Sequence, residues 1–225
     1  MSRNPDPHAK IALLRAAEEV FATKGLVGAK IEEITRRAGT SKGAFYLHFE
    51  SKDVAFREVV ESFLARCQAV MQSPSDYPVL PHTAPEMLDF WLTRDIEMFE
   101  FLWQNRAILR ILGGCQGPHV YLMETFRAGI ATNCQAWLEV SKELGFYRRE
   151  LDQEVVATLI CGAYHELVHK MLASTERPPI GEWLREAQSA FVRGLGTPKL
   201  IEAVVADAEA LEKADREPRR ARRRA

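Results

Sequence analysis

The sequence holds 225 residues, of which 47% are hydrophobic and 27% charged, with a formal net charge of −1, a balance typical of a globular protein that buries a core. The chain has no apolar run of about 18 residues, which argues against a transmembrane helix, and its N-terminal stretch lacks the apolar segment of a signal peptide. Its four cysteines contain no Cys-x-x-Cys pair and do not form a disulfide framework, so we expect a cytoplasmic protein without membrane contacts.

Charge is divided unevenly along the chain. Residues 1–60 hold ten Lys and Arg against eight Asp and Glu, whereas residues 61–211 hold thirteen against twenty. Residues 212–225 hold seven against three. A mildly basic N-terminal part on an acidic body indicates that a polyanionic partner would contact the N-terminal part.

The first expected helix has an apolar face formed by Ile11, Leu14, Ala17 and Phe21. We expect it to end at Lys24-Gly25, because Gly25 suits the left-handed position that follows many helices. Strand signals are almost absent here and in the rest of the chain.

Three further helices follow the first at short intervals. The second starts near Ile31 and ends at Gly39, the third is capped by Ser41 and runs to about Phe49, and the fourth is capped by Ser51. Their apolar residues, together with those of the first helix, are expected to close a small core: Ile31, Ile34, Ala38, Phe45 and Phe49.

A proline-rich loop at 73–85 separates these helices from the rest of the body. Helical periodicity then resumes, and the basic run of about 216–225 is expected to be disordered. The sequence therefore predicts an all-α fold of nine or ten helices, with one domain at 1–52 and a second at 53–225. The later helices are expected at about 85–104, 105–112, 118–144, 152–173, 180–195 and 198–215.

The turn at Gly39 has the spacing of a helix-turn-helix. The second helix of that motif enters the major groove of DNA by its N-terminal end. The start of this helix carries hydroxyl groups and backbone amides, which suit phosphates, and a lysine, which suits a phosphate or a guanine edge. A glycine at the same place leaves room for the DNA duplex to approach. A small helical bundle with solvated lysines is the alternative. We expect Lys42 and Thr40 to contact base edges. The other expected DNA-contacting residues are Lys30, Ser41, Gly43, Ala44, Tyr46, His48 and Lys52.

The stretch "FATKGLVGAKIEEITRRAGTSKGAFYLHFESKDVAF", residues 21–56, resembles the TetR family of bacterial transcriptional regulators. The resemblance implies a ligand-responsive repressor that binds a palindromic operator as a dimer and has no enzymatic activity or cofactor. It rests on matches to the family pattern at Phe21, Gly25, Ile34, Ala38, Gly39, Ser41, Gly43, Tyr46, Phe49 and Lys52.

Three positions depart from that pattern. Gly28-Ala29-Lys30 stands where the family usually has a serine or threonine that caps the second helix, so that cap is expected to be lost. Thr35 and Thr40 stand where the family usually has an alanine and an apolar residue. Because of these two additional hydroxyl groups near the DNA groove, the operator sequence cannot be inferred from the family pattern.

The resemblance also implies dimerisation through the last two long helices. From Glu154 to Leu172, two columns of residues spaced by four are almost entirely apolar, and together they cover most of the helix surface. Such a helix needs neighbours on two sides, which a second subunit or a helix pair within one chain would supply. The expected dimer residues are Leu167, Met171, Trp183, Ala187, Phe191 and Gly194.

Aromatic residues are dense between residues 85 and 170, where the resemblance implies an effector pocket. Each of them also fits an ordinary core position. Together they suit a small, largely apolar or aromatic molecule. The expected pocket residues are Trp91, Phe99, Trp103, Arg106, Tyr121, Phe126, Trp137, Cys161, Tyr164 and His165.

The segment "HELVH" matches the His-Glu-x-x-His pattern of zinc proteases. A zinc-dependent hydrolase would use His165, Glu166 and His169, although no third ligand stands at a suitable spacing. Cys161, His165 and His169 form a column that suits a soft divalent metal, so a metal- or thiol-responsive regulator is a second alternative. The simpler interpretation is that the cysteine and the two histidines line an interface and bind no metal.

Overall fold

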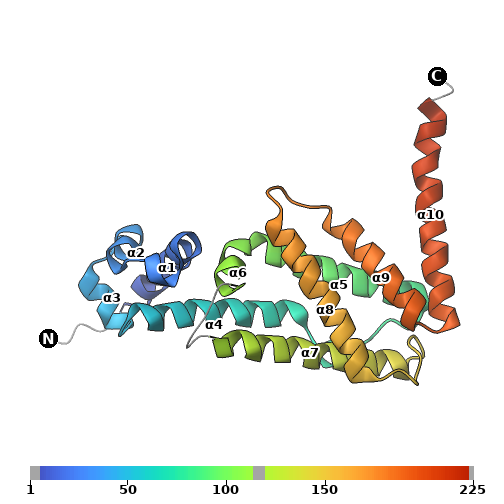
Figure 1. Cartoon of the computed structure of the whole chain (residues 1–225), viewed down its shortest axis with the longest axis horizontal. Helices are drawn as coiled ribbons and strands as arrows, with labels where there is room; N and C mark the ends of the chain where they lie inside the picture. The colour runs from blue at the N-terminus through green and yellow to red at the C-terminus, as the bar shows by residue number, and fades with distance from the viewer. Residues whose placement is uncertain (1–5, 114–119, 223–225) are drawn as a thin grey trace. The chain divides into compact units, whose positions relative to one another are not determined.

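The computed structural model describes residues 6–113 and 120–222 (Figure 1). In these residues the chain forms α-helices and one short 3-10 helix, η1, with no β-strand, which confirms the all-α prediction. None of the described helices is long and apolar enough to cross a membrane. The elements are α1 Pro7–Gly28, α2 Ile31–Arg37, α3 Lys42–His48, α4 Lys52–Met71, η1 Pro74–Asp76, α5 Ala84–Gln104, α6 Arg106–Gly113, α7 Val120–Glu143, α8 Gln153–Ala173, α9 Ile180–Leu195 and α10 Pro198–Arg222.

The chain divides into two compact units. The first comprises residues 1–70 and 101–128, and the second comprises residues 71–100 and 129–225. The functional boundary that we expect between residues 52 and 53 remains a prediction, because compact packing and functional division need not coincide.

In the first unit, α1 packs against α2, α3 and α6. Ile34 of α2, Phe45 of α3 and Phe49 directly after α3 are buried as predicted, whereas the expected core residues Ile31 and Ala38 are only half-buried. The ring of Phe21 meets the edge of Phe56 with centroids 5.1 Å apart. These apolar contacts hold α1, α2, α3 and the start of α4 together as one body.

The expected apolar stripe of α1 is confirmed at Ala17 and Phe21, which are fully buried, but not at its N-terminal end. Ile11 is 51% exposed, whereas Leu13 and Val20 are fully buried beside Ala17. The buried residues 13, 16, 17, 20 and 21 follow the spacing of three and four that one helical face requires, and Ile11 lies outside that face. The prediction of Ile11 as a core residue was therefore wrong.

Two glycines adopt left-handed backbone conformations around α2. Gly25 has φ +67° and ψ 175°, so the regular helix is broken there, as expected, and a kinked last turn to Gly28 follows, in which Ala29 N donates to Gly25 O at 3.2 Å. Gly39 has φ +65° and turns the chain between α2 and α3. The amide of Thr40 then donates to Thr35 O at 2.9 Å, which closes the turn.

Serine side chains cap the next two helices, as predicted. Ser41 Oγ accepts a hydrogen bond from Ala44 N at 3.1 Å, and Ser51 Oγ accepts one from Val54 N at 3.2 Å. Lys52 Nζ donates to Ala29 O at 2.8 Å and to Val27 O at 3.3 Å, so it joins the start of α4 to the end of α1.

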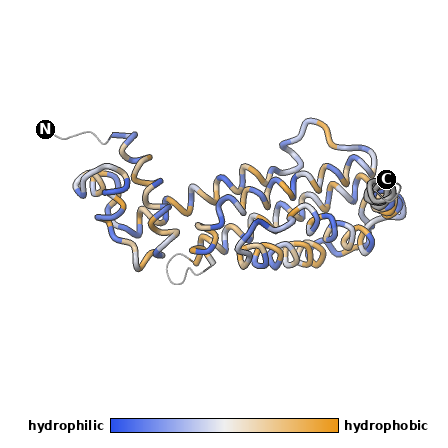
Figure 2. Tube along the Cα trace, turned by 90° about the horizontal axis from the view of Figure 1, so that it is seen from above, coloured by the Kyte–Doolittle hydropathy of each residue, from blue (hydrophilic) through white to orange (hydrophobic). Residues whose placement is uncertain are grey.

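The second unit is built from α8, α9, α10 and parts of α5 and α7. Its helices alternate between apolar and polar residues, as the colours along the trace in Figure 2 show. Gln188 of α9 is buried and donates to Leu88 O at 2.8 Å, which satisfies its amide inside the apolar core. The buried core comprises Ala84, Met87, Leu88, Leu138, Phe146, Tyr147, Val156, Ala157, Val192, Leu200 and Val204.

The last helix is longer than expected. α10 runs to Arg222, past the end expected near residue 215, and residues 223–225 lie outside the described part.

Gly39→Ala should lower the free energy of unfolding by about 1–2 kcal/mol, because a Cβ opposes the left-handed conformation. Gly43→Ala is the matched control, since its added Cβ would meet only Ser41 Oγ, at an ordinary 3.7 Å. Urea unfolding followed by circular dichroism measures both variants. Equal stability of Gly39→Ala and the wild type would contradict the role given to this turn.

Candidate functional site

One face of helix α3 is buried, and the opposite face is exposed to solvent. Phe45 is buried, whereas Tyr46 and Leu47 are 50% and 52% exposed, and Lys42 and Gly43 are exposed as well. Gly43 needs no special backbone angle and has room for a Cβ in the free protein. Its lack of a side chain therefore leaves space on the outer surface, where a large partner can approach closely.

Lys42 forms an ion pair with Glu32 of α2. Its Nζ lies 2.7 Å from Glu32 Oε1, and both side chains are exposed. The hydrogen bond from Lys42 lowers the pKa of Glu32, and the same bond raises the pKa of Lys42. Exposed ion pairs contribute little to stability, so a phosphate can replace Glu32 as the partner of this lysine.

Other cations of α1 and α2 are paired in the same way. Lys24 lies 2.6 Å from Glu33, and Arg37 lies 2.9 Å from Glu19. In contrast, the exposed side chain of Arg36 makes no hydrogen bond or ion pair with the described part of the chain. Sequence reasoning missed Arg36, although its position just before the turn and outside the apolar spacing of α2 was a usable signal.

Lys30 stands at the N-cap position of α2 and forms no side-chain cap there, as expected from the missing serine or threonine. Its side chain is exposed. An exposed lysine beside the uncapped amides of a helix start is available for an anion.

The remaining predicted contact residues are held in different ways. The Thr40 hydroxyl is buried and has no hydrogen-bond partner among the described residues, so a base-edge contact requires rotation of this side chain. His48 is half-buried, with its ring 6.2 Å from that of Phe49, and Ala44 is half-buried. In the free protein the half-buried Lys52 donates from its ammonium group to two backbone carbonyls.

The expected dimer residues lie on α8 and α9, but one of them is excluded. Met171 is fully buried within the chain, so it has no surface to lose to a second subunit, and that prediction was wrong. Gly194 is exposed, and the others, Leu167, Trp183, Ala187 and Phe191, are half-buried. Val155 and Leu159 of α8 are 56% and 58% exposed and form a more accessible apolar surface.

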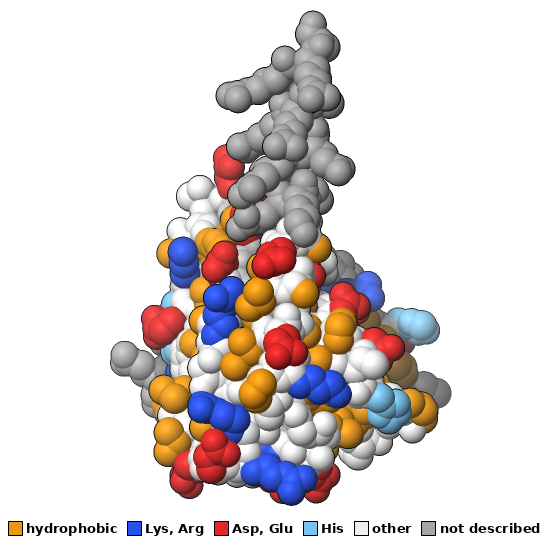
Figure 3. Space-filling view, turned by 90° about the vertical axis from the view of Figure 1, so that its right-hand side faces the viewer, with side chains coloured by type: hydrophobic (Ala, Val, Ile, Leu, Met, Phe, Trp, Pro, Cys, Tyr) orange, Lys and Arg blue, Asp and Glu red, His pale blue; other side chains and the backbone are white. Residues whose placement is uncertain are grey.

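Charge on the visible end of the second unit is mixed. Figure 3 looks onto the end that carries α10, where the coloured apolar side chains lie between acidic and basic ones. This face offers no extended field of one sign to a polyanion.

The ten expected pocket residues are divided between the two units. Trp103, Arg106, Tyr121 and Phe126 belong to the first unit, where the Arg106 guanidinium lies 4.3 Å from the Trp103 ring centroid. The other six belong to the second unit: Trp91, Phe99, Trp137, Cys161, Tyr164 and His165.

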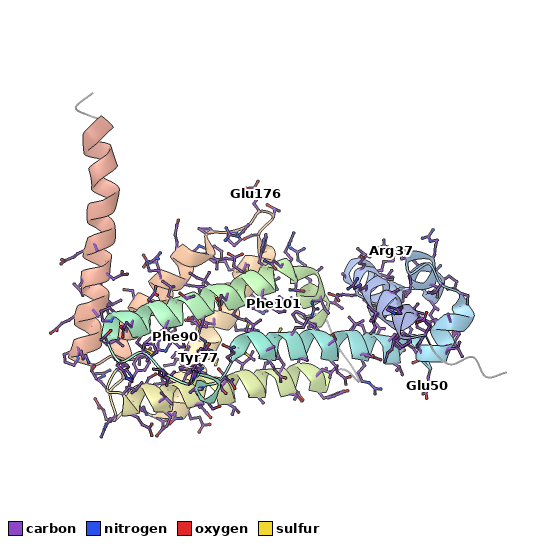
Figure 4. All side chains as sticks on the ribbon, turned by 180° about the vertical axis from the view of Figure 1, so that it is seen from behind. Arg37, Glu50, Tyr77, Phe90, Phe101 and Glu176 are labelled. Carbon is purple, nitrogen blue, oxygen red and sulfur yellow. The ribbon has the colours of Figure 1, made fainter. Side chains whose placement is uncertain are left out.

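Trp137 belongs to a cation–aromatic cluster that holds the chain at Gln72. The Arg94 guanidinium lies 4.2 Å from the Trp137 ring centroid and also covers Phe90 and Tyr77, which lie side by side in Figure 4. Trp137 Nε1 donates to Gln72 O at 3.2 Å, and an Arg94 nitrogen donates to the same oxygen at 2.7 Å. Trp137 therefore has a structural role in fixing the segment before α5.

A cluster of polar side chains occupies the interior of the second unit. The Tyr164 hydroxyl donates to Asp95 Oδ2, and burial raises the pKa of Asp95 to about 6. Burial also raises the pKa of Tyr147 and Tyr164, and the charge of Asp95 adds to both shifts. Asp95 is thus the central acid of this cluster.

Two thiols from neighbouring helices join the cluster. The thiols of Cys134 on α7 and Cys161 on α8 interact, and this interaction raises the pKa of Cys134 and lowers that of Cys161. Neither cysteine is in a disulfide. Cys161 thus pairs with a thiol that the sequence analysis did not consider.

The two histidines of the HELVH segment approach each other closely. His165 Nε2 lies 3.2 Å from His169 Nε2, and His165 Nδ1 lies 3.6 Å from Glu166 Oε1. Across residues 6–113 and 120–222, however, no group of three or more His, Cys, Asp or Glu has an arrangement that can hold a metal ion. The hydrolase and metal-sensor alternatives are not supported.

Comparisons with known proteins agree with this arrangement. The family model described as "Bacterial regulatory proteins, tetR family" matches residues 13–59. The chain is 28% identical over 177 residues to the uncharacterized HTH-type transcriptional regulator YdgC of Bacillus subtilis, covering 74% of this chain and 83% of YdgC. It is 22% identical to the HTH-type transcriptional repressor DhaR of Mycobacterium sp., covering 76% and 86% of the two chains.

Solved structures share the fold. SmeT, the repressor of a Stenotrophomonas maltophilia multidrug efflux pump, superimposes with a TM-score of 0.66 at 18% identity, over 85% of this chain and 92% of SmeT. A putative fatty acid metabolism regulator of Clostridium perfringens superimposes with a TM-score of 0.61 at 24% identity, over 81% and 97%.

Asp95→Asn should stabilise the second unit above about pH 6. A carboxyl whose pKa is raised by burial to about 6 binds its proton more readily in the folded state, so stability falls as pH rises from the ordinary pKa of 3.8 to about 6. The variant removes this loss, by about 1–3 kcal/mol, and should differ little from the wild type near pH 4.

Urea unfolding at several pH values measures this effect. Arg94 is the nearby cation, and its charge lowers the pKa of Asp95 less than burial raises it. Asp89→Asn, an exposed position on the same helix, is the control and should show no such pH dependence. A stability difference for Asp95→Asn that is constant with pH would contradict the assignment.

Proposed function

This chain belongs to the TetR family of bacterial regulatory proteins, and from that premise we propose that it is a ligand-responsive transcriptional regulator that binds double-stranded DNA through α2 and α3. The observation that carries the proposal is the outward face of α3, where Lys42, Gly43 and Tyr46 are exposed beside a buried Phe45. A short helix anchored by its apolar face and open on its polar face has the form needed to enter a major groove.

The contacts to DNA divide into three groups. Lys42 lies at the start of α3 and reaches a guanine edge or a phosphate once Glu32 is displaced. Lys30, Tyr46 and Arg36 are exposed on the same two helices and suit phosphates. Lys52 positions α4 against the end of α1, because its ammonium is held by Ala29 O and Val27 O.

We assign the active form to a homodimer. A palindromic operator needs two heads about one helical turn apart, roughly 34–36 Å. The exposed apolar residues Val155 and Leu159 of α8, with Gly194 of α9, favour these helices as the subunit contact. Small and apolar residues on exposed helix faces permit close packing of helices from two subunits.

Repression is the mode of regulation that the relatives favour. DhaR of Mycobacterium sp. and BepR of Brucella suis are both named transcriptional repressors, while FasR of Mycolicibacterium smegmatis is named an activator. We also propose that the protein acts in the cytoplasm, where its DNA partner lies. We assign no enzymatic reaction to it.

The double variant Lys42→Ala/Tyr46→Ala should bind its operator at least about 30-fold more weakly, since it loses one base-edge or phosphate contact and one further phosphate contact. The operator is obtained by selection from random duplexes with the wild-type protein, and affinity is measured by fluorescence anisotropy. Both side chains are exposed, so circular dichroism and the mass of the assembly should not change.

The same titrations at increasing salt test the nature of the contact. Wild-type affinity should fall steeply with salt, and the double variant should show a shallower slope because fewer counterions are released. Unchanged operator affinity in the double variant, or no dependence on salt, would contradict the DNA-binding role of α3.

Glu32→Gln should raise DNA affinity by roughly threefold or more at low salt, because it frees Lys42 and removes a negative charge near the phosphates. Glu61→Gln is the control, since Glu61 is also exposed and paired with a base, at 3.9 Å from Arg57, but lies on α4. Equal effects of the two substitutions would indicate that only net charge matters and not the position of Glu32.

A further inference from the structure

We propose that Leu47 recognises thymine in the operator, by placing its side chain against the C5-methyl group that thymine carries in the major groove. This assignment rests on the proposed function, because it names a specificity-determining residue of the same DNA-binding surface. Leu47 belongs to α3 and is 52% exposed. Its aliphatic side chain offers a duplex apolar surface and no hydrogen bond.

The position of Leu47 on α3 follows from helix geometry. Residues two apart lie on nearly opposite sides of an α-helix, because each turn takes about 3.6 residues. Phe45 is fully buried and contacts Phe49 with ring centroids 5.2 Å apart, so it fixes the inner side of α3. Leu47 is therefore held on the outer side, away from the core that anchors the helix.

The outer side of α3 consists of two strips, each made of exposed residues that are four positions apart. Lys42 and Tyr46 form a polar strip. Gly43 and Leu47 form the second strip, which has no hydrogen-bonding side chain. A Cβ at Gly43 would meet only Ser41 Oγ, at 3.7 Å, so the surface beside Leu47 is open to a partner.

Leu47 can reach base edges although it stands near the C-terminal end of α3. The seven residues of this helix span roughly 10 Å, which is less than the roughly 12 Å width of the major groove. Side chains of a helix also lean toward its N-terminus, so Leu47 covers the turn that begins at Gly43. Because Gly43 has no side chain, the backbone of this turn can lie close to the bases.

The chemistry of the major groove makes thymine the base that suits a leucine. Guanine, adenine and cytosine present hydrogen-bond donors and acceptors there, whereas thymine presents a methyl group beside its acceptor. An aliphatic side chain against a donor or acceptor removes water from it and gives no hydrogen bond in return, which weakens binding. Against a methyl group the same side chain buries apolar area, which strengthens binding. Leu47 therefore favours thymine at one position of each half-site.

The other apolar residues of α3 suit this role less well. Phe45 is fully buried and Ala44 is half-buried. Tyr46 is exposed but carries a hydroxyl group, which suits a phosphate. Leu47 is thus the exposed aliphatic side chain of α3, a helix that the structure describes in full.

Removal of single methyl groups from the operator tests this assignment with the full-length protein. The operator is selected from random duplexes with the wild-type protein. Deoxyuridine then replaces thymine at one symmetric pair of positions at a time, so that only C5-methyl groups are lost, and fluorescence anisotropy measures each affinity. At one pair of positions the wild type should bind about tenfold more weakly, since each half-site loses one buried methyl group.

Leu47→Ala should bind the thymine operator at least about tenfold more weakly. It should lose no further affinity with deoxyuridine at that pair of positions, because its contact with the methyl group is already absent. Leu47→Met keeps a long apolar side chain and should retain the sensitivity to deoxyuridine. Ile11→Ala is the matched control, since Ile11 is an aliphatic residue of α1 with a similar exposure of 51%, and this variant should respond to deoxyuridine as the wild type does.

Two results would overturn the assignment of Leu47. One is an operator in which deoxyuridine weakens wild-type binding at no pair of positions, and the other is the same weakening in Leu47→Ala as in the wild type. If either occurs while the wild type binds its operator with a steep dependence on salt, the role of Leu47 fails and DNA binding through α3 stands. Failure of the wild type to select any duplex would overturn both.

Discussion

The burial of Phe45 and Phe49 against α1 determines how the N-terminal helices meet their surroundings. Both rings are almost completely buried, and in a seven-residue helix this fixes which side chains point outward. Lys42, Gly43 and Tyr46 are exposed as a result. The DNA-binding role therefore depends on apolar packing, and the polar residues act through the orientation that this packing imposes.

Most of the fold follows from local signals in the sequence. The bounds of α3 and α4 were predictable because Ser41 and Ser51 cap them, and Gly39 marks the turn before α3. The apolar face of α1 was predicted correctly at Ala17 and Phe21 but not at Ile11, which looks like a core residue by type alone. The length of α10 was also missed, because a charged composition fits both an exposed helix and a disordered tail.

The candidate sites were less predictable, since they depend on contacts between residues distant in sequence. The hydrogen bond from Lys52 to Ala29 O joins residues 23 positions apart in the sequence, and the hydrogen bond from Tyr164 to Asp95 joins residues 69 positions apart. Aromatic density predicted the region of the interior cluster, but Asp95 gave no signal, because a single aspartate in a helix is usually solvated. Its burial became visible only once α5 and α8 were placed together.

Methylation interference on a selected operator tests the placement of α3 most directly. Methyl groups on guanine N7 block the major groove, and those on adenine N3 block the minor groove. Interference by guanine N7 in two clusters about 10 base pairs apart, with tolerated adenine N3 methylation inside them, is the predicted result. Interference confined to adenine N3, or a single cluster, would contradict the entry of paired α3 helices into the major groove.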